Sequence, residues 1–319
     1  MGAYIIRKIL TFIPMLLVIS FLVFGGMYLM PGDAVDFMVS PDALASISQE
    51  DLHAIRESLG LNDPFVVQYS KWLWNLLRGN FGYSLQSGVA VSTLMMNHLP
   101  ATIELSVAAL IISSLFGTLF GIFSALRKGT FADMALSVFG MIGVAIPQFL
   151  LGLILIVVFT FNLEWLPVGG RMASSSQGFF GRLPYLVMPA LALGFSMLAG
   201  VMRYSRSSML DSLNRDYIKT ARSKGLPEWR VNIMHGIRVA MSPIVVLIGF
   251  RLPMLIGGAV VIEQVFQWPG VGMLFIQAVR SQNTPIVMIV GFFSAMMVLL
   301  SSLIVDVLIA VLDPRIKLS

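Results

Sequence analysis

The chain has 319 residues, of which 57% are hydrophobic and only 12% are charged. Such a low share of charge cannot cover a water-soluble surface, which excludes a soluble enzyme, a secreted disulfide scaffold and a disordered chain. The absence of cysteine also excludes disulfides, cysteine-ligated zinc and a thiol nucleophile.

Six segments are apolar and long enough to cross a bilayer, which needs about 20 helical residues. Five of them carry no charge, and the fifth in chain order contains Arg251. The runs are too long for β-barrel strands and do not alternate with period two. The sequence therefore predicts an all-α membrane protein with six transmembrane helices. The predicted spans are residues 9–30, 105–126, 134–160, 183–202, 239–262 and 285–305.

The first span follows Arg7 and Lys8, as the apolar core of a signal peptide would. Its apolar run is too long for that role, and Met30-Pro31-Gly32-Asp33 lacks a small-x-small cleavage site, which predicts a retained helix. Most Lys and Arg residues of the short loops lie on the side of the N-terminus. The positive-inside rule then places both termini in the cytoplasm and explains the net charge of +5 without a nucleic-acid partner.

The largest segment predicted outside the membrane is 31–94. Ser48 precedes acidic residues at a helix start, and Gly60 is a natural end for that helix. A second amphipathic helix is expected from Phe65 to Leu77, with two tryptophans that favour a membrane–water interface. The segment therefore predicts two short helices lying on the outer surface.

The second long polar stretch, 203–238, is predicted in the cytoplasm between the fourth and fifth spans. Residues 208–224 are compatible with a helix, Gly225 ends it, and a short helix is expected over residues 226–231. The fifth span should then begin near Val239. A cytoplasmic helix of this length is not needed to cross a membrane, which favours a docking role.

The short helix carries Leu226 and Trp229 three residues apart, so the two side chains are expected on one face. Glu228 and Arg230 flank that face with opposite charges, and Pro227 lies at its start. An apolar contact with a polar rim is typical of a docking surface. An amphipathic hairpin resting on the lipid surface has the same composition and remains the alternative.

Two ionisable residues lie within predicted spans, Arg251 in the fifth and Asp306 in the sixth. An unpaired charge at that depth costs on the order of 3 kcal/mol. Arg251 has two interpretations: a structural pair with Asp306, or a place on a polar pathway where it meets a substrate carboxylate. Pro253, Gly257 and Gly258 suit local bending and close packing in the same span.

A turn at Trp268-Pro269-Gly270 follows the fifth span, and the apolar run 273–279 after it is too short to cross the bilayer. This run is expected in the outer interface or partway into the membrane, where irregular backbone is tolerated only when protein buries it. The candidate translocation path therefore lies near this element. Its residues are Arg251, Pro253, Gly257, Gly258, Trp268, Pro269 and Gly270.

Catalytic and phosphate-binding motifs are missing from the chain. It has no G-x-x-x-x-G-K-[ST] loop and no H-E-x-x-H pair. Gly194-Phe195-Ser196 begins a nucleophile elbow, but Leu198 stands where the final glycine is required. The three histidines fall on different predicted levels of the membrane and cannot form one metal site. We therefore expect no enzymatic activity, and no cofactor or metal bound by this chain.

The stretch 216–226 resembles the EAA loop of ABC-importer permeases, in the form found in their peptide/nickel branch. The general pattern has Glu, Ala and Ala before the glycine; this chain has Lys219, Thr220 and Ala221, so only Ala221 and Gly225 follow it. Other stretches resemble the same branch, and most of all the "B" permease subunits of dipeptide and oligopeptide importers. They are Met30-Pro31-Gly32-Asp33 and residues 68–84, 100–105, 203–226, 268–272 and 313–316.

The resemblance implies a type I ABC-importer permease fold with six spans. The N-terminal cytoplasmic tip and the first span would occupy residues 1–30, the extracytoplasmic segment 31–94, the transmembrane core with the other five helices and the EAA-like loop (203–238) would occupy 95–312, and a cytoplasmic tail 313–319. It also implies a second, homologous permease, two cytoplasmic ATPases that bind ATP and Mg, and an extracytoplasmic binding protein. The ATPase-coupling residues would be Lys219, Thr220, Ala221, Gly225, Leu226, Pro227, Glu228, Trp229 and Arg230.

The function implied is import of di- or oligopeptides by alternating access across the cytoplasmic membrane of a prokaryote. The same architecture carrying nickel, a glycoside or another small solute is the alternative within this class. An ion-coupled secondary transporter is a different class, which usually has broken helices in repeated halves and several intramembrane carboxylates, whereas only Asp306 is predicted here. An intramembrane hydrolase is disfavoured by the missing motifs.

Overall fold

The computed structural model describes residues 2–29, 35, 47–58, 60–171 and 178–312. These residues form helices joined by turns, with one isolated β-bridge between Tyr83 and Ala90. Five helices are long and apolar enough to cross a membrane, and a bent pair supplies a sixth candidate span. The predicted all-α architecture is therefore confirmed. Pro31-Gly32-Asp33 and the tail 313–319 lie outside the described residues.

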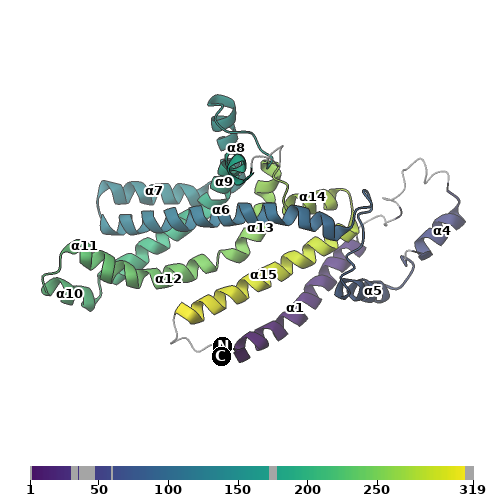
Figure 1. The fold of residues 1–319 in the computed structure, drawn as a ribbon, viewed down its shortest axis with the longest axis horizontal. Helices are drawn as coiled ribbons and strands as arrows, with labels where there is room; N and C mark the ends of the chain where they lie inside the picture. The colour runs from purple at the N-terminus through teal and green to yellow at the C-terminus, as the bar shows by residue number, and fades with distance from the viewer. Residues whose placement is uncertain (1, 30–34, 36–46, 59, 172–177, 313–319) are drawn as a thin grey trace.

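The candidate spans follow the chain in the order that the sequence predicts. Helices α1 and α15 lie side by side, and α6, α7 and α9 pack together next to them (Figure 1). The elements that form the spans are α1 (Gly2–Tyr28), α6 (Val91–Leu126), α7 (Phe131–Ala145) with α8 (Gln148–Leu155) and η1 (Ile156–Asn162), α9 (Gly178–Leu213), α11 (Glu228–Arg230) with η3 (Val231–Ile237) and α12 (Arg238–Gly249), and α15 (Thr284–Leu312).

The packing of α6 on α9 rests on a row of mostly small residues along α6. Small side chains at this spacing let two helix backbones approach closely. A Cβ added to Gly121 would lie 2.4 Å from the carbonyl oxygen of Met202, and one added to Gly117 would lie 2.9 Å from that of Leu198. The buried row is Ala101, Leu105, Ala109, Ser113, Gly117, Gly121 and Ala125.

The third predicted span, 134–160, is not one straight helix. Helix α7 ends at Ala145, the backbone of Ile146 is extended (φ −83°, ψ 121°), and α8 leaves at an angle of 104°. Proline explains the bend, because Pro147 disfavours the helical conformation of the residue before it and has no N–H to donate. The expectation of one continuous span is corrected to a bent pair.

The fifth predicted span is also broken, and it begins earlier than expected. Helix α12 ends at Gly249, and α13 (Leu252–Val265) begins after Arg251. Pro253 lies in the first turn of α13, so its missing N–H leaves the Gly249 carbonyl without the usual helical donor. On the cytoplasmic side the helix starts at Glu228 and not near Val239, because α11, η3 and α12 are continuous.

The outer segment contains the two helices that the sequence predicts, α4 (Gln49–Ser58) and α5 (Phe65–Leu77). Ser48 Oγ accepts the backbone N–H of Asp51 at 3.1 Å, which is the expected N-cap bond. Helix α5 lies on α1 through aromatic rings, among them Phe21 and Phe65, whose centroids are 5.2 Å apart. The outer segment is thus attached to the first span by edge-to-face packing.

Candidate functional site

The cytoplasmic loop between α9 and α12 is divided by a bend that the sequence does not reveal. The helix expected over residues 208–224 is two helices, because α9 ends at Leu213 and α10 (Asp216–Ser223) begins after an extended Arg215 (φ −77°, ψ 154°). Met209 packs against α12, whereas Ile218 belongs to a separate small core in the loop. The chain must turn between Leu213 and Asp216 so that Met209 can pack in one core and Ile218 in the other.

Gly225 reverses the chain at the end of α10, as the sequence predicts. Its φ is +75°, a conformation that glycine adopts at little cost. The N–H of Gly225 donates to the carbonyl of Arg222 at 2.9 Å, and the N–H of Leu226 donates to that of Ala221 at 3.4 Å. These two bonds form a Schellman motif. A Cβ added to Gly225 meets no atom within 4 Å. Glycine is therefore needed here for its positive φ angle and not because a side chain would clash.

Leu226 and Trp229 do not share a face, which corrects the sequence prediction. Leu226 packs inward against the small core of the loop, whereas Trp229 is 60% exposed. Because Pro227 has an extended backbone (φ −65°, ψ 144°), the helix starts only at Glu228 and helical spacing does not extend back to Leu226. The small core consists of Ile218, Ala221 and Val231, with Leu226 against it.

Charged side chains surround the exposed Trp229. Arg222 donates from Nε and Nη2 to the two carboxylate oxygens of Glu228, at 2.8 Å and 3.2 Å. These bonds raise the pKa of Arg222 above its ordinary value, so the guanidinium stays charged. The guanidinium of Arg230 lies 5.3 Å from the centre of the Trp229 ring. The predicted polar rim is present, around one aromatic side chain instead of two apolar ones.

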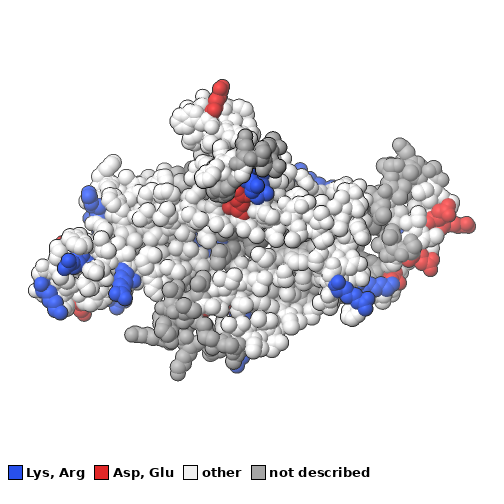
Figure 2. Space-filling model, in the orientation of Figure 1, with Lys and Arg blue, Asp and Glu red and all other residues white. Residues whose placement is uncertain are grey.

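At the EAA-like positions, Lys219 and Thr220 are exposed, whereas Ala221 is buried in the small core. Lys219 pairs with Asp216 one turn earlier at 2.9 Å, and the Thr220 hydroxyl donates to the Asp216 carbonyl at 3.1 Å. Lysine and arginine side chains gather at this end of the molecule (Figure 2). The loop therefore offers a basic, solvent-facing surface with Trp229 in it.

An apolar row continues from Trp229 along the next helical segment. Ile233 is 55% exposed and Met234 is 58% exposed, both in the π-helical segment η3. From Glu228 the helix runs without interruption to Gly249, next to Arg251 (Figure 1). One continuous helix therefore connects Trp229 to the break in the fifth span.

The structure does not bring Arg251 and Asp306 together. Asp306 pairs with Lys8 of α1 and accepts the hydroxyl of Tyr4 at 3.0 Å. Arg251 lies against α9, where a Cβ added to Gly200 would lie 2.4 Å from its Nη2 atom. The sequence missed Lys8 as the partner because α1 begins at Gly2, which places Lys8 inside the helix and opposite α15.

The remaining residues of the candidate path have different surroundings. Pro253 lies at the break, as expected for a bending position. Gly257 and Gly258 belong to α13, but their surroundings lie outside the described part of the chain. Trp268 is fully buried, and its indole N–H donates to the carbonyl of Ala101 at 2.8 Å. Trp268 is thus a core residue of the outer half.

The turn after α13 leads into α14 (Val271–Arg280), the short apolar run that the sequence places at the outer side. Glu263 has no exposed surface and lies beneath this turn. A Cβ added to Gly270 would lie 2.1 Å from its carboxylate, so the glycine provides the space for the charge. Glu263 is not among the residues predicted from the sequence, although an isolated acidic residue before a Pro-Gly turn could have indicated a buried polar contact.

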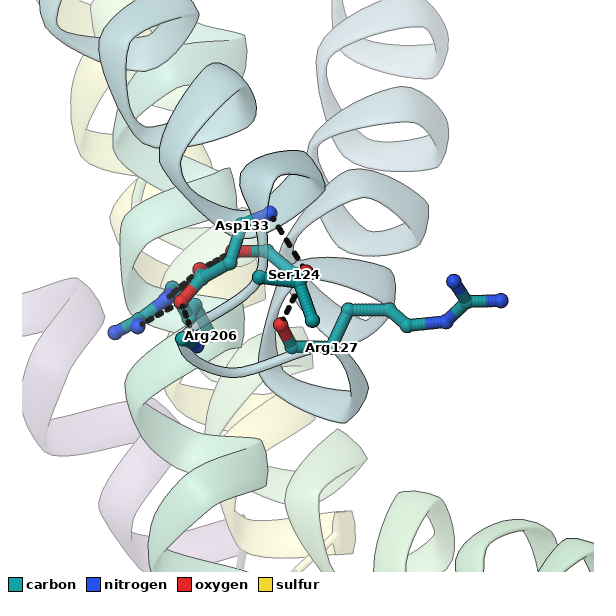
Figure 3. A network of polar contacts seen from close by, with 6 residues as sticks. Ser124, Arg127, Asp133 and Arg206 are labelled. Carbon is teal, nitrogen blue, oxygen red and sulfur yellow. Dashed lines mark hydrogen bonds and ion pairs between the residues drawn. The ribbon is translucent and has the colours of Figure 1, made fainter.

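A second buried carboxylate that the sequence reasoning missed is Asp133, in the first turn of α7. Arg206 of α9 donates to both of its oxygens at 2.8 Å, and the Ser124 hydroxyl donates to Oδ1 at 2.5 Å (Figure 3). The N–H of Gly129 donates to Oδ2 at 3.0 Å. This network joins the turn between α6 and α7 to α9. Thr130, an N-cap residue followed three positions later by Asp133, is the sequence pattern that could have indicated this helix start.

Within the described ranges, no group of three or more His, Asp or Glu side chains could hold a metal ion. The site is built from an exposed loop, a long continuous helix and two broken spans, with partly buried ion pairs between the helices.

Comparison with known proteins assigns this architecture. Residues 117–318 match the family model described as binding-protein-dependent transport system inner membrane component, and residues 1–106 match the model of the N-terminal part of such components. The oligopeptide transport system permease protein AppB of Bacillus subtilis is 43% identical over 99% of this chain and 100% of its own length. A putative peptide permease protein of Brucella ovis is 38% identical over 99% of both chains.

Two further similarities extend the comparison. The glutathione transport system permease protein GsiC of Salmonella typhi is 34% identical over 98% of both chains. A solved structure described as an amino acid ABC transporter with histidines superimposes with a TM-score of 0.51 at 18% identity, over 70% of this chain and 95% of the other. At that identity the likeness supports the fold alone.

Proposed function

This chain belongs to the inner membrane components of binding-protein-dependent transport systems, and we propose that it forms half of the path by which an ATP-driven importer carries peptides into the cell. The family assignment makes it a multi-pass membrane permease subunit and not an enzyme. The observation that carries the peptide proposal is the full-length similarity to permeases named for oligopeptides and glutathione.

The basic loop supports a contact with cytoplasmic ATPase subunits. Trp229 is exposed in a charged rim, an arrangement that suits insertion into a partner's cleft, because aromatic side chains supply contact area and the rim supplies specificity. The docking residues proposed are Trp229 and Arg230, with Glu228 held in place by Arg222. Gly225 and Pro227 set the direction of the loop and Leu226 anchors it from inside.

Motion would pass from this contact to the membrane along the helix that begins at Glu228. Closure of the ATPases on ATP and Mg would displace Trp229, and the continuous helix would carry that displacement to the break at Arg251. The proposed translocation path runs near this break, between this chain and a second, homologous permease. An extracytoplasmic binding protein would deliver the substrate to the outer side.

The experiment is purification of the tagged chain from its native membrane, followed by mass spectrometry of the proteins that remain bound. The purified complex is then placed in liposomes with ATP and Mg inside, and uptake of a labelled tripeptide is measured with and without the binding protein. We expect peptide uptake that requires both ATP and the binding protein.

The control arms use Ni²⁺ and a labelled disaccharide in place of the peptide. Uptake of either solute without uptake of the peptide would contradict the proposed substrate but keep the mechanism. Uptake by the chain alone, driven by an ion gradient and independent of ATP, would contradict the mechanism itself.

A further inference from the structure

The outer end of the molecule contains a buried carboxylate that contacts three helices. Glu263 is the last acidic residue of α13 and has no exposed surface. Its Oε1 accepts the hydroxyl of Thr102, on α6, at 2.7 Å, and its Oε2 accepts the backbone N–H of Met273, on α14, at 2.9 Å. One side chain of α13 is therefore bonded to both neighbouring helices.

The same contact satisfies the beginning of α14. The first N–H groups of a helix have no partners within the helix, and burying them unsatisfied is unfavourable. Here the N–H of Val271 donates to Thr102 Oγ1 at 2.8 Å, and the N–H groups of Gly272 and Met273 face the Glu263 carboxylate. The acceptor oxygens of Glu263 thus lie at the end of α14 where the N–H groups point outward.

The sequence around the contact leaves space for the carboxylate and little else. A Cβ on Gly272 would lie 2.7 Å from the Cα of Val260 and 2.9 Å from Glu263 Oε2, and Gly270 has no room for one either. Trp268 closes the other side with its bond to the Ala101 carbonyl. The carboxyl group is thus shielded from water and held by directed hydrogen bonds, and separating the helices would leave buried polar groups without partners.

We propose that Glu263 is a positioning residue that makes α6, α13 and the short helix α14 one rigid body, which moves as a unit during transport. Helix α14 would then not swing away from α6 to open the outer side. The outer side would open only by displacement of the whole unit. This inference rests on the proposed transport function, and it identifies α6, α13 and α14 as the unit that moves during transport.

The first test uses two variants. Thr102→Val removes the hydroxyl that both accepts from Val271 and donates to Glu263, and Glu263→Gln puts an NH₂ donor in place of one of the two accepting oxygens. Thr102→Ser keeps both hydrogen bonds and is the matched control. Uptake and binding-protein-stimulated ATP hydrolysis are measured per assembled complex, after size-exclusion chromatography. We expect Thr102→Ser to match the wild type, and the other two to lose roughly tenfold in both quantities, a typical size for lost coupling.

A contact that only stabilises the fold would lower the amount of complex and leave activity per complex unchanged, and that result would overturn the proposal. A wild-type complex without peptide uptake would instead count against the proposed function.

The second test covers the case in which the first variants do not assemble. The chain has no native cysteine, so Leu99→Cys on α6 with Leu274→Cys on α14 provides a single thiol pair, in the core that the two helices share and away from the bonds of Glu263, that a short, reducible thiol crosslinker can join. If the helices form one rigid body, the crosslinked complex keeps at least about half of the uptake seen after reduction, because no required motion is blocked. Uptake that disappears on crosslinking and returns with reductant would show that α14 swings, and would overturn the proposal.

Discussion

Trp229 is 60% exposed, and the guanidinium of Arg230 lies over its ring. For that reason we expect Trp229→Ala to leave the folded permease intact while weakening retention of the ATPases by roughly tenfold or more, as for an interface anchor. The measurement is the amount of ATPase that copurifies with the tagged chain.

The matched control is Trp165→Ala, since Trp165 is 70% exposed but follows η1 at the outer side. It should not alter ATPase retention. Equal retention in the wild type, Trp229→Ala and Trp165→Ala would contradict the docking role of Trp229.

Arg206 supplies the only cation bonded to the buried Asp133 in the part of the chain that the structure describes. Removing one partner of a buried ion pair leaves an uncompensated charge and costs about 3–5 kcal/mol. Arg206→Ala should therefore lower the thermal unfolding temperature of the purified complex clearly. Lys219→Ala breaks an exposed pair with Asp216 and should change the temperature little. Similar unfolding temperatures for the two variants would mean that the Arg206–Asp133 network does not stabilise the fold.

The turn between α10 and α11 depends on backbone conformation more than on side-chain contacts. A β-branched residue in the left-handed region costs about 1–2 kcal/mol, so Gly225→Val should redirect the loop and abolish ATP-driven uptake. Asparagine tolerates this conformation, so Gly225→Asn should keep most of the uptake. The measurement is peptide uptake per inserted permease. Loss of uptake in both variants would indicate a role for the glycine other than its φ angle.

The contact between α6 and α9 depends on glycine for a different reason, namely space. Gly121→Ala would place a methyl group 2.4 Å from the Met202 carbonyl oxygen, and overpacking of this kind costs typically 1–3 kcal/mol. We expect a reduced fraction of monodisperse protein in fluorescence-detected size-exclusion chromatography. Gly26→Ala is the same change in α1, where the added methyl group meets no atom within 4 Å, and should leave that fraction unchanged. A reduction of equal size in both would contradict the packing argument.

Across the whole molecule, two intramembrane cations are predicted to behave differently. Lys8→Ala leaves the partly buried Asp306 without its cation, so the yield of assembled complex should fall. Asp306 keeps Lys8 in Arg251→Ala, so the yield should fall less than in Lys8→Ala. Uptake per complex should fall, because Arg251 lies at the break proposed to border the path. The measurements are complex yield and uptake per complex. Normal uptake in assembled Arg251→Ala would remove Arg251 from the path.

Several elements could be predicted from the sequence because their causes are local. The length of apolar runs gives the spans, Ser48 gives the start of α4, and Gly225 gives the end of α10. Pro147 could have given the bend in the third span, since proline restricts its own residue and the one before it. Pro253 could be predicted as a bending position, but the sequence did not predict that the span divides there into two helices, α12 and α13.

The amino-acid sequence by itself determined that this chain is an all-helical membrane protein with a basic cytoplasmic loop, because hydrophobic length, charge bias and the conformations of glycine and proline are properties of short segments. Only the tertiary structure decided the partners of the acidic residues between the helices: Lys8 for Asp306, Arg206 for Asp133, and Thr102 with the start of α14 for Glu263. It also turned Leu226 inward and Trp229 outward. These pairings depend on which helices lie side by side, and that is set by packing along their whole length.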